Sequence, residues 1–316
     1  MSNFIIHIGM PRTATTFFQQ KIFPLLPDYT SFNLETTHFN DVFNQLQFAD
    51  DTFYDKTKIL NFANGCKNKN IILSNENFVG QSYFLNHNNR TIIAKRLSEA
   101  FPEAKIFLVL RNQIDLLASL YAIALEWRET KHIDDYIWQS KKNKNIDVEA
   151  GPAKLYYNTY EDYENIEGYD YLSLIQLYKK HFKHVEVLLF EELIQQPTDF
   201  ATKLDVLFGF EQPTTISLLN QTELLNKSVD VVQARKLRKL NKFQNLASHS
   251  KLLYRIYVKL KRNILKKKRS DEKPFFSLKK TAELKKHFGK LNQQLAEQYP
   301  EIGIQNYSDN YYLNFK

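Results

Sequence analysis

The most informative stretch of the sequence lies near the N-terminus and is Asn3-Phe-Ile-Ile-His-Ile-Gly-Met-Pro-Arg-Thr-Ala-Thr-Thr16. Residues 3–8 form a short apolar run with β-branched members, which predicts a buried strand. The run stops at Gly9 and Pro11, and the segment from Thr13 to about residue 23 has a polar start and a helical pattern. The stretch therefore predicts a strand, a tight loop and a helix in direct succession.

Three more apolar runs predict further strands, at 71–73, 105–110 and 185–190. None of them alternates apolar with polar residues, as is typical of strands buried on both faces. Helical patterns follow these runs, at about 91–100, 114–128, 170–182 and 199–208. Strands that alternate with helices predict an α/β fold with three layers around a central parallel sheet.

The last third of the chain has a different character. After Pro213 the strand pattern is replaced by helical patterns at about 230–245, 250–267 and 278–298. The polar segment 140–168 predicts a long surface loop. We expect an α/β core over residues 1–226 and a basic helical C-terminal extension over residues 227–316, packed on the core.

Composition excludes several classes of protein. Of the 316 residues, 43% are hydrophobic and 25% are charged, values that exclude a disordered or fibrous chain. The single cysteine, Cys66, excludes an intrachain disulfide framework and a cysteine-rich metal site. The first residues lack a signal-peptide pattern, and no apolar run approaches the ~20 residues of a membrane helix. We expect a cytoplasmic protein, with peripheral contact at the inner face of the membrane as a further option.

The net charge of +8 is unevenly distributed. Residues 227–290 hold 21 Lys and Arg against 4 Asp and Glu, a local balance of +17, so the rest of the chain carries −9. Apolar residues recur at helical spacing within this basic segment, at Leu253, Ile256, Tyr257, Leu260 and Ile264. The pattern indicates either a solvated helix surface or a surface for a polyanionic acceptor or an anionic membrane.

The loop after the first strand has the features of an anion site. Ligands of open α/β sheets bind at the carboxyl ends of strands, where this loop lies. The backbone N–H groups of Thr13 to Thr16 and the start of the helix can cradle a phosphate, Arg12 adds a cation, and Thr15 and Thr16 add hydroxyls. The alternative is a loop with an ordinary Thr cap. The second Gly and the Lys of a P-loop are absent, which disfavours NTP hydrolysis.

Residues Gly9 to Thr16 resemble the 5′-phosphosulfate-binding loop of sulfotransferases, Gly-x-Pro-Lys-x-Gly-Thr-Thr. Pro11, Thr15 and Thr16 match, Arg12 stands in the place of Lys, and Ala14 stands in the place of Gly. Arginine keeps the positive charge. Ala14 is acceptable in the loop only if its φ is negative.

A second match follows the strand at 105–110. Arg111 comes directly after it and Ser119 eight residues later, as do the Arg and Ser that bind the 3′-phosphate of the donor in this family. Two weaker similarities are the segment 189–197 and the sequence Asn226-Lys227-Ser228, which resembles the Asn-x-Ser that closes over the nucleotide. The resemblance covers about residues 3–230. It implies a P-loop-NTPase-like fold and 3′-phosphoadenosine 5′-phosphosulfate as the donor.

The resemblance also indicates catalytic residues. Glu76 follows the second buried strand, where similar glycosaminoglycan-type enzymes place a catalytic Glu, so we expect it to be the general base. A turn or capping Glu is the alternative, and His38 and His87 are rival bases. Arg12 would stabilise the leaving oxygen.

His7, inside a strand, is expected to be a core residue, and Ser74 could equally be a structural turn hydroxyl. No metal is expected.

These observations predict a sulfotransferase that acts on a hydroxyl or amine, most simply of a glycan. Two alternatives remain open: a P-loop nucleotide or small-molecule kinase, and a non-enzymatic protein that binds nucleic acid through the basic helices. The second of these leaves the two phosphate motifs unexplained, so we expect no nucleic-acid partner. Tyr121, Trp127 and Arg128 could line an acceptor cleft, but aromatic residues at helical spacing more often belong to the core.

Overall fold

The computed structural model describes residues 3–33, 40–80, 89–127, 129–138, 164–220, 229–244, 247, 249–266 and 275–314. The chain forms two compact units. The first comprises Met1–Arg111, Glu167–Leu225 and Phe288–Phe315, and the second Asn112–Ile166, Asn226–His287 and Lys316. Both units take residues from either side of residue 226, where the sequence predicts a domain boundary, and that boundary stays a prediction.

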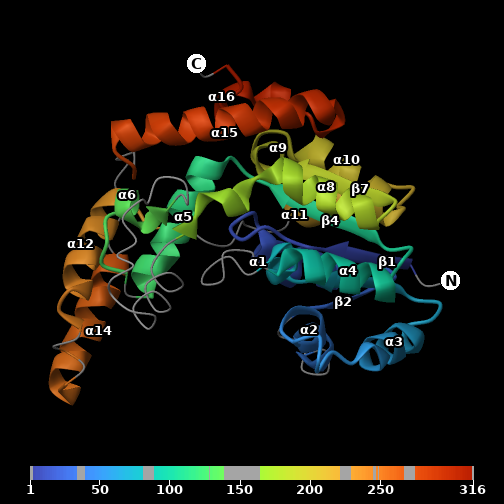
Figure 1. The fold of residues 1–316 in the computed structure, drawn as a ribbon, viewed down its shortest axis with the longest axis horizontal. Helices are drawn as coiled ribbons and strands as arrows, with labels where there is room; N and C mark the ends of the chain where they lie inside the picture. Colours follow the sequence, from blue (N-terminus) through green and yellow to red (C-terminus); the bar gives the residue numbers. More distant parts are fainter. Residues whose placement is uncertain are drawn as a thin grey trace. The chain divides into compact units, whose positions relative to one another are not determined.

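The first unit contains a five-stranded parallel sheet in the order β2-β3-β1-β4-β7. Figure 1 labels all of these strands except β3. The strands are β1 (Asn3–His7), β2 (Tyr29–Phe32), β3 (Asn70–Ser74), β4 (Lys105–Leu110) and β7 (His184–Leu189). Four of them were predicted to within one residue or so at either end. The edge strand β2 was missed because its sequence, Tyr-Thr-Ser-Phe, has no apolar run and its side chains are half-exposed or exposed. The first strand lies in the middle of the sheet, so the loop after it leaves from the centre of the carboxyl edge.

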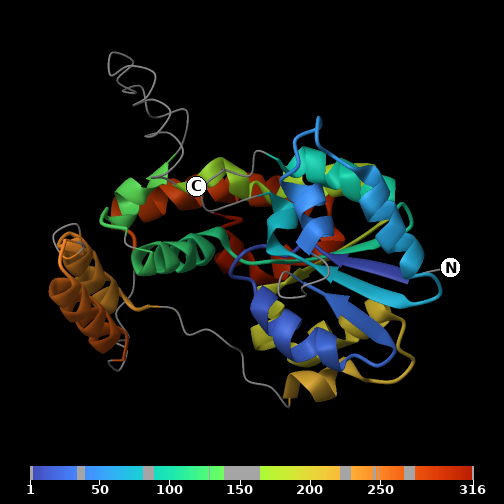
Figure 2. The same cartoon turned by 90° about the horizontal axis from the view of Figure 1, so that it is seen from below.

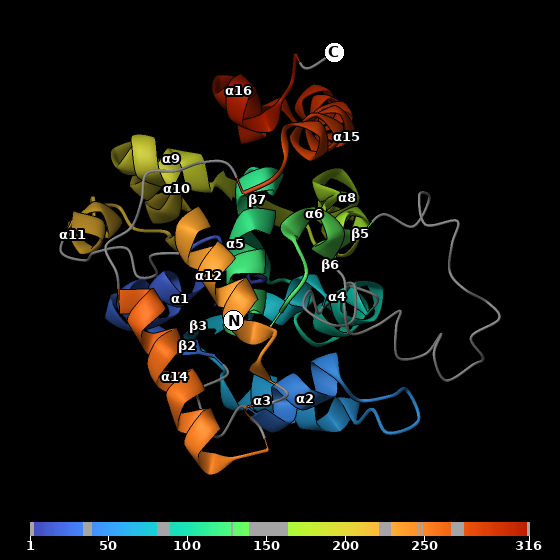
Figure 3. The same cartoon turned by 90° about the vertical axis from the view of Figure 1, so that its left-hand side faces the viewer.

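Helices cover both faces of this sheet (Figures 2 and 3). One face carries α1 (Thr15–Phe17), α9 (Phe190–Gln195), α10 (Pro197–Phe208) and α11 (Thr215–Asn220), and the other carries α4 (Arg90–Ala100) and α8 (Tyr171–His181). The first face packs on an aromatic core in which the Phe18 ring stacks on Phe200 at 6.1 Å and meets Phe107 edge-on at 5.9 Å. Each such buried ring contributes roughly 1.5–3 kcal/mol. The three layers confirm the predicted α/β fold.

The helix predicted for residues 13–23 is not a regular one. A single turn of α1 is followed by a π-helix, η1 (Phe18–Ile22), and a 3₁₀ turn, η2 (Phe23–Leu25). Phe17 and Phe18 are both buried, as are Ile22 and Phe23 five residues later. A five-residue repeat matches the π-helix, whose hydrogen bonds join i to i+5, so both pairs reach the core.

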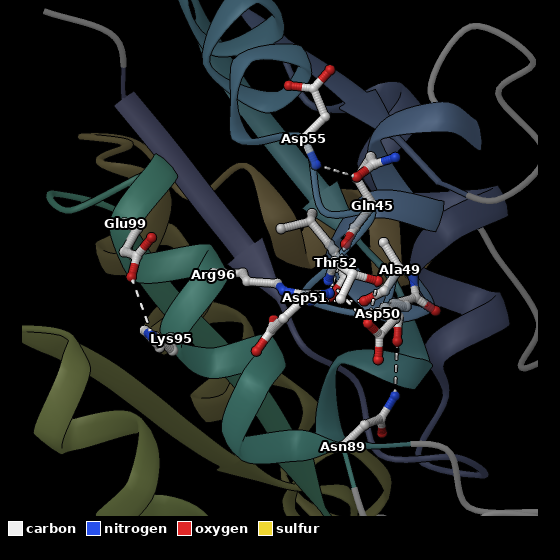
Figure 4. Close-up of polar contacts among 12 residues, drawn as sticks. Gln45, Ala49, Asp50, Asp51, Thr52, Asp55, Asn89, Lys95, Arg96 and Glu99 are labelled. Atoms are coloured by element: carbon white, nitrogen blue, oxygen red, sulfur yellow. Dashed lines mark hydrogen bonds and ion pairs between the residues drawn. The ribbon is translucent and has the colours of Figure 1, made fainter.

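A buried arginine holds the segment between β2 and β3 in place (Figure 4). This segment contains α2 (Asn40–Gln47) and α3 (Lys56–Gly65), which the sequence analysis did not predict. Arg96, on α4, donates to the carbonyl oxygens of Gln45 and Ala49 at 2.9 and 2.7 Å and pairs with Asp51 at 2.8 Å. Its guanidinium also lies 4.1 Å from the centre of the Tyr54 ring. The guanidinium thus binds two carbonyl oxygens and a carboxylate from the end of α2 and the turn after it, so Arg96 has a structural role.

The second unit is mainly helical. It contains α5 (Gln113–Glu126), α6 (Ile133–Tyr136), α12 (Val231–Asn241) and α14 (Lys251–Lys266), with a short parallel pair of β5 (Ile137–Trp138) and β6 (Glu164–Asn165). Asn241 connects three helices: its amide donates to Leu125 O and Glu129 O, both at 2.8 Å, and its carbonyl accepts from Tyr257 Oη at 2.8 Å.

The predicted surface loop 140–168 is wrong at its end. Residues 139–163 lie outside the described part of the chain, but β6 and the 3₁₀ helix η6 (Ile166–Tyr169) follow them. Ile166 and Tyr169 are buried, and this burial gives the segment a structure that its polar neighbours in the sequence conceal.

The end of the chain returns to the first unit. Helix α15 (Leu278–Gln298) is followed by η7 (Pro300–Ile302), η8 (Ile304–Tyr307) and α16 (Ser308–Tyr311). Asn292 Nδ2 donates to Tyr311 O at 2.9 Å, and Tyr311 Oη donates to Glu191 Oε2 at 2.8 Å. Among the described residues, no helix combines the length and apolar character needed to cross a membrane.

Candidate functional site

The candidate site is built where three strands of the first unit end side by side. Ile8 N donates to Phe107 O at 3.0 Å, and Asn75 N donates to His7 O at 3.1 Å. These bonds hold the end of β1 between the ends of β4 and β3. The sheet therefore brings residues 9–14, 75–76 and 111 to one edge, as expected for a ligand site of an α/β fold.

The loop between β1 and α1 has an unusual backbone. Gly9, Arg12 and Ala14 have φ values of 39°, 66° and 67°. The condition of a negative φ at Ala14 is not met, because this residue takes the left-handed conformation as the N-cap of α1. Left-handed geometry costs a non-glycine residue roughly 1–2 kcal/mol. Such strain is typical of functional loops, where the surrounding structure enforces it.

Packing under the loop explains why position 9 is glycine. A Cβ added to Gly9 would lie 3.0 Å from Thr15 Oγ1 and 3.3 Å from His7 Cε1. Thr13 and Thr15 are buried, and their hydroxyls donate to Met10 O at 2.6 and 3.1 Å. Both hydroxyl protons are thus used inside the loop. What these threonines offer an anion is the backbone N–H, since the first N–H groups of a helix lack intrahelical partners.

The remaining loop residues differ in exposure. Pro11 is buried, whereas Arg12 and Thr16 are half-buried. Arg12 therefore keeps part of its side chain at the surface of the edge, where a ligand could reach its guanidinium.

Arg111 is fixed next to this loop. Its Nη1 donates to Arg12 O at 3.1 Å, and its guanidinium carbon lies 4.7 Å from the centre of the Phe190 ring. Tyr171 Oη donates to Arg111 O at 2.6 Å, which holds the backbone as well. The two predicted cations, Arg12 and Arg111, therefore come together at one edge.

The predicted base lies beside the same loop. Glu76 is the half-buried first residue of the 3₁₀ helix η4 (Glu76–Val79), and Asn75 caps this helix by accepting from Asn77 N at 2.9 Å. Burial raises the pKa of the Glu76 carboxyl, and the positive charge of Arg12 opposes that increase. A carboxylate with a raised pKa is a stronger base, which suits proton abstraction from a hydroxyl.

A buried polar group lies beneath the loop. His7 Nδ1 is 2.8 Å from Ser74 Oγ, and Gln19 Nε2 donates to the same oxygen at 3.0 Å. Burial lowers the pKa of His7 to about 3, so its ring is neutral, and it stacks on Phe107 at 5.0 Å. His7 is the core residue that its place in a strand predicts, and Ser74 is its hydrogen-bonding partner at the end of β3.

Two polar residues at this edge were missed by the sequence analysis. Gln19 reaches Ser74 from the π-helix, a geometry that no sequence pattern indicated. Asn75 is buried, and its Nδ2 has no hydrogen-bond partner among the described residues. Its place two residues after a predicted strand could have indicated it. An unused buried donor at this edge fits a site that accepts a polar ligand.

Several predicted residues are not brought to this edge. Ser119 is buried on α5 in the second unit, so its pairing with Arg111 stays a prediction. Tyr121 is buried and donates to Lys131 O at 2.7 Å, whereas Trp127 is 56% exposed.

Six predicted residues lie outside the described part of the chain: His38, His87, Arg128, Asn226, Lys227 and Ser228. In the described ranges, no group of three or more His, Cys, Asp or Glu residues could hold a metal ion.

No protein-family model matches this sequence, and no curated protein matches it. Among solved structures, it is similar to a sulfotransferase from Alicyclobacillus acidocaldarius, with 15% identity and a TM-score of 0.44, over 85% of this chain and 97% of that one. It is also similar to mouse sulfotransferase SULT7A1 complexed with PAP, with 13% identity and a TM-score of 0.34, over 78% of this chain and 68% of that one. At these values, the similarity alone assigns no function to the chain.

Proposed function

We propose that the protein is a sulfotransferase that moves the sulfuryl group of 3′-phosphoadenosine 5′-phosphosulfate to a hydroxyl or amine, most simply of a glycan. The observation that carries the proposal is the arrangement of Arg12 and Glu76. Arg12 and Glu76 follow the adjacent strands β1 and β3, whose ends are joined by the bond from Asn75 N to His7 O at 3.1 Å. Both side chains are half-buried, and the charge of Arg12 opposes the increase in the pKa of the Glu76 carboxyl. Sulfuryl transfer needs one group for the leaving oxygen and one for the acceptor proton.

The donor would lie along the carboxyl edge of the sheet. The backbone N–H groups of residues 13–16 would hold the 5′-phosphosulfate, as helix starts hold anions. Arg111 and Ser119 would bind the 3′-phosphate, and Asn226, Lys227 and Ser228 would cover the nucleotide. Arginine suits this role because its planar guanidinium pairs with two phosphate oxygens.

The transfer itself would be an in-line displacement. The acceptor oxygen forms a bond to sulfur as the bond from sulfur to the bridging oxygen breaks, and adenosine 3′,5′-bisphosphate leaves. Glu76 takes the proton of the acceptor hydroxyl. Arg12 and the loop N–H groups stabilise the negative charge that develops on the bridging oxygen. No step requires a metal ion.

The kinase alternative shares the fold and the loop. It would need a Lys to contact the β- and γ-phosphates, and the loop has Ala14, Thr15 and Thr16 where Gly-Lys-Ser/Thr would be. Among the described residues at the edge of the sheet, none favours it over sulfuryl transfer.

Calorimetry with three ligands tests the donor. We expect adenosine 3′,5′-bisphosphate to bind the full chain at least tenfold more tightly than 5′-AMP, because each charge-assisted hydrogen bond to the 3′-phosphate contributes roughly 1.5–3 kcal/mol. Arg111→Ala should remove this preference, and Lys21→Ala, which removes an exposed cation just beyond the loop, should retain it. Equal affinity for the two nucleotides, or preference for ATP, would contradict the proposal.

A transfer assay tests the mechanism. Arg12→Ala should lower kcat on the order of 10²-fold or more, because the leaving oxygen loses its cation. The thermal unfolding temperature should change little, since Arg12 is half-buried on a polar loop. Near-normal transfer by a folded Arg12→Ala enzyme would remove Arg12 from the mechanism.

A further inference from the structure

An apolar surface is exposed on the second unit, along α12 and α14. Leu253, Ile256 and Leu260 of α14 are 41–47% exposed, and Phe243, just after α12, is 64% exposed. Together with Leu240 they line an open groove of about 410 Å³. We call these five residues and their groove the α12–α14 groove. Single exposed apolar residues are common on proteins, but a contiguous group of them marks an interaction surface.

The groove exists because α12 covers only part of the apolar face of α14. Tyr257 is buried and bonds to Asn241, and Gln233 Nε2 donates to Ile264 O at 3.2 Å. These contacts attach one side of the apolar face to α12. Residues 253, 256 and 260 are three and four positions apart, so they share an adjacent strip about 60° wide. That strip stays open to solvent.

The groove is surrounded by positive charge. Residues 231–266 contain 11 Lys and Arg and no Asp or Glu. Lys239 lines the groove from the side of α12, and Lys259, which is exposed, lies about 60° from Ile256 around α14. An apolar strip with cations on both borders is therefore built into the surface.

We propose that the α12–α14 groove is a docking surface for an anionic lipid bilayer. Interfacial helices combine these two features: apolar side chains enter the boundary between headgroups and acyl chains, and flanking Lys and Arg residues contact anionic headgroups. A soluble polyanion or a nucleic acid would be held by the cations and would gain nothing from exposed Leu, Ile and Phe side chains. The proposal does not depend on the reaction at the sheet edge.

Vesicle co-sedimentation of the full chain tests the charge requirement. We expect binding to vesicles of phosphatidylcholine with a quarter phosphatidylserine, weaker binding to phosphatidylcholine alone, and weaker binding at high salt. Replacing Lys259, Arg262 and Lys266 with Glu should weaken binding at least fivefold for each charge removed. Replacing Lys58, Lys67 and Lys69, which are exposed in the first unit, is the matched control and should leave binding unchanged.

A second set of variants tests the apolar requirement. Ile256→Ser and Leu260→Ser should each weaken binding about tenfold, since a side chain that enters the bilayer is lost. Phe53→Ser, at a residue 78% exposed in the first unit, is the control. As a test that leaves the fold unchanged, the fluorescence that Phe243→Trp adds to that of Trp127 and Trp138 should be quenched by brominated lipids, whereas the fluorescence that Phe53→Trp adds should not.

Three results would overturn the proposal. The first is no binding of the unaltered chain to anionic vesicles. The second combines two findings. A soluble polyanion such as dextran sulfate, or a DNA duplex, binds the chain with the same affinity as anionic vesicles, and brominated lipids do not quench the fluorescence added by Phe243→Trp. The third is self-association without lipid that Ile256→Ser abolishes, which would assign the groove to a second copy of the chain.

Discussion

At the scale of single residues, two opposing effects act on Glu76. Its burial favours the neutral carboxylic acid, whereas the positive charge of Arg12 favours the carboxylate, and burial is the larger effect. The outcome is a group that ionises at a higher pH than an ordinary Glu, whose pKa is about 4.3. In its proposed role as general base, such a carboxyl changes its protonation state closer to neutral pH than an ordinary Glu does.

The pH dependence of transfer should reflect this carboxyl. A general base must be ionised, so kcat should fall as the pH decreases through the raised pKa of Glu76. Glu76→Gln should abolish transfer while nucleotide affinity is retained. Glu103→Gln, at an exposed position before β4, is the control and should retain both. If the Gln variant keeps most of its activity, the base is another group, and His38 and His87 are next to be tested.

The Glu76 carboxyl should also make the free energy of unfolding decrease as the pH rises. Its pKa is raised in the folded chain, so its contribution to stability is present at pH values below the pKa of the unfolded chain and is lost as the pH rises through the folded pKa. The stability of Glu76→Gln relative to the unaltered chain should therefore increase from pH 4 to pH 7. Urea unfolding of both proteins across this range measures the difference, and a constant difference would contradict it.

His7 should have the opposite effect. Its folded pKa of about 3 lies below the unfolded value of 6.5, so the stability it allows is present above pH 6.5 and decreases as the pH falls toward 3. Each pH unit in this window costs up to about 1.4 kcal/mol, so roughly 2 kcal/mol should be lost between pH 6.5 and pH 5. His7→Gln should remove that part of the slope, whereas His184→Gln, at an exposed position, should keep it. Identical slopes for all three proteins would show that His7 is not buried as neutral imidazole.

Residue positions were predictable where they lie in the segment that follows a buried strand. Arg111 comes directly after β4, Glu76 two residues after β3 and Arg12 five residues after β1, and adjacent parallel strands bring these segments to one edge. Gln19 was not predictable, because its contact with Ser74 depends on a π-helix. The hydroxyl of Thr15 was expected to face a ligand, but the loop folds back on Met10 O and uses its proton.

At the scale of elements, the β1–α1 loop combines strain with internal hydrogen bonds. Arg12 and Ala14 are left-handed, and the hydroxyls of Thr13 and Thr15 converge on one carbonyl. Apart from Arg111, which donates to Arg12 O, these groups that hold the loop are not ones that would contact a ligand. As the proposed anion site, such a preorganised loop would lose little entropy when it binds its ligand.

Substitutions at Ala14 should separate backbone geometry from side-chain size. Ala14→Gly should keep stability within about 1 kcal/mol, since glycine adopts φ 67° without strain while the methyl contact is lost. Ala14→Val should lower stability by well over 1 kcal/mol, because a β-branched residue is an outlier at this φ. The control is Ala63→Val in α3, where Val costs under about 0.7 kcal/mol. Urea unfolding measures all three, and a tolerated Val at position 14 would contradict the left-handed assignment.

Elements with a strong apolar pattern were predicted and those held by tertiary contacts were not. The strands β1, β3, β4 and β7 are apolar runs, and the sequence indicates them directly. The segment with α2 and α3 is ordered by carbonyl contacts to Arg96 on α4, a long-range arrangement without local pattern. The edge strand β2 is defined by its pairing with β3 rather than by its own residues.

At the scale of the whole molecule, the end of the chain is part of the first unit's core. Phe288, Leu295 and Tyr311 are buried, and Tyr311 bonds to Glu191 at the start of α9. The predicted C-terminal extension includes these residues together with the basic helices, because they continue a helical, Lys-rich pattern. The charge of a segment depends only on its own residues, so it could be read from the sequence. The burial of these residues depends on contacts with residues far along the chain, so it could not.

The contact between α15 and the residues after it predicts an unusual sign for a helical substitution. Replacing Gly with Ala inside a helix ordinarily stabilises a protein by up to about 1 kcal/mol. At Gly289 the added Cβ would lie 2.5 Å from Tyr312 O, a backbone atom that cannot move aside cheaply. Gly289→Ala should therefore destabilise the chain by roughly 1–3 kcal/mol, the usual cost of overpacking.

Gly65 provides the matched control for this prediction. It ends α3, and a Cβ added there meets nothing within 4 Å, so Gly65→Ala should be neutral or slightly stabilising. Thermal and urea unfolding of the two variants should move in opposite directions or differ by more than about 1 kcal/mol. If Gly289→Ala is as stable as Gly65→Ala, residues 308–314 do not pack on α15 in solution. The burial of Tyr311 against Glu191, which depends on that packing, would then be lost as well.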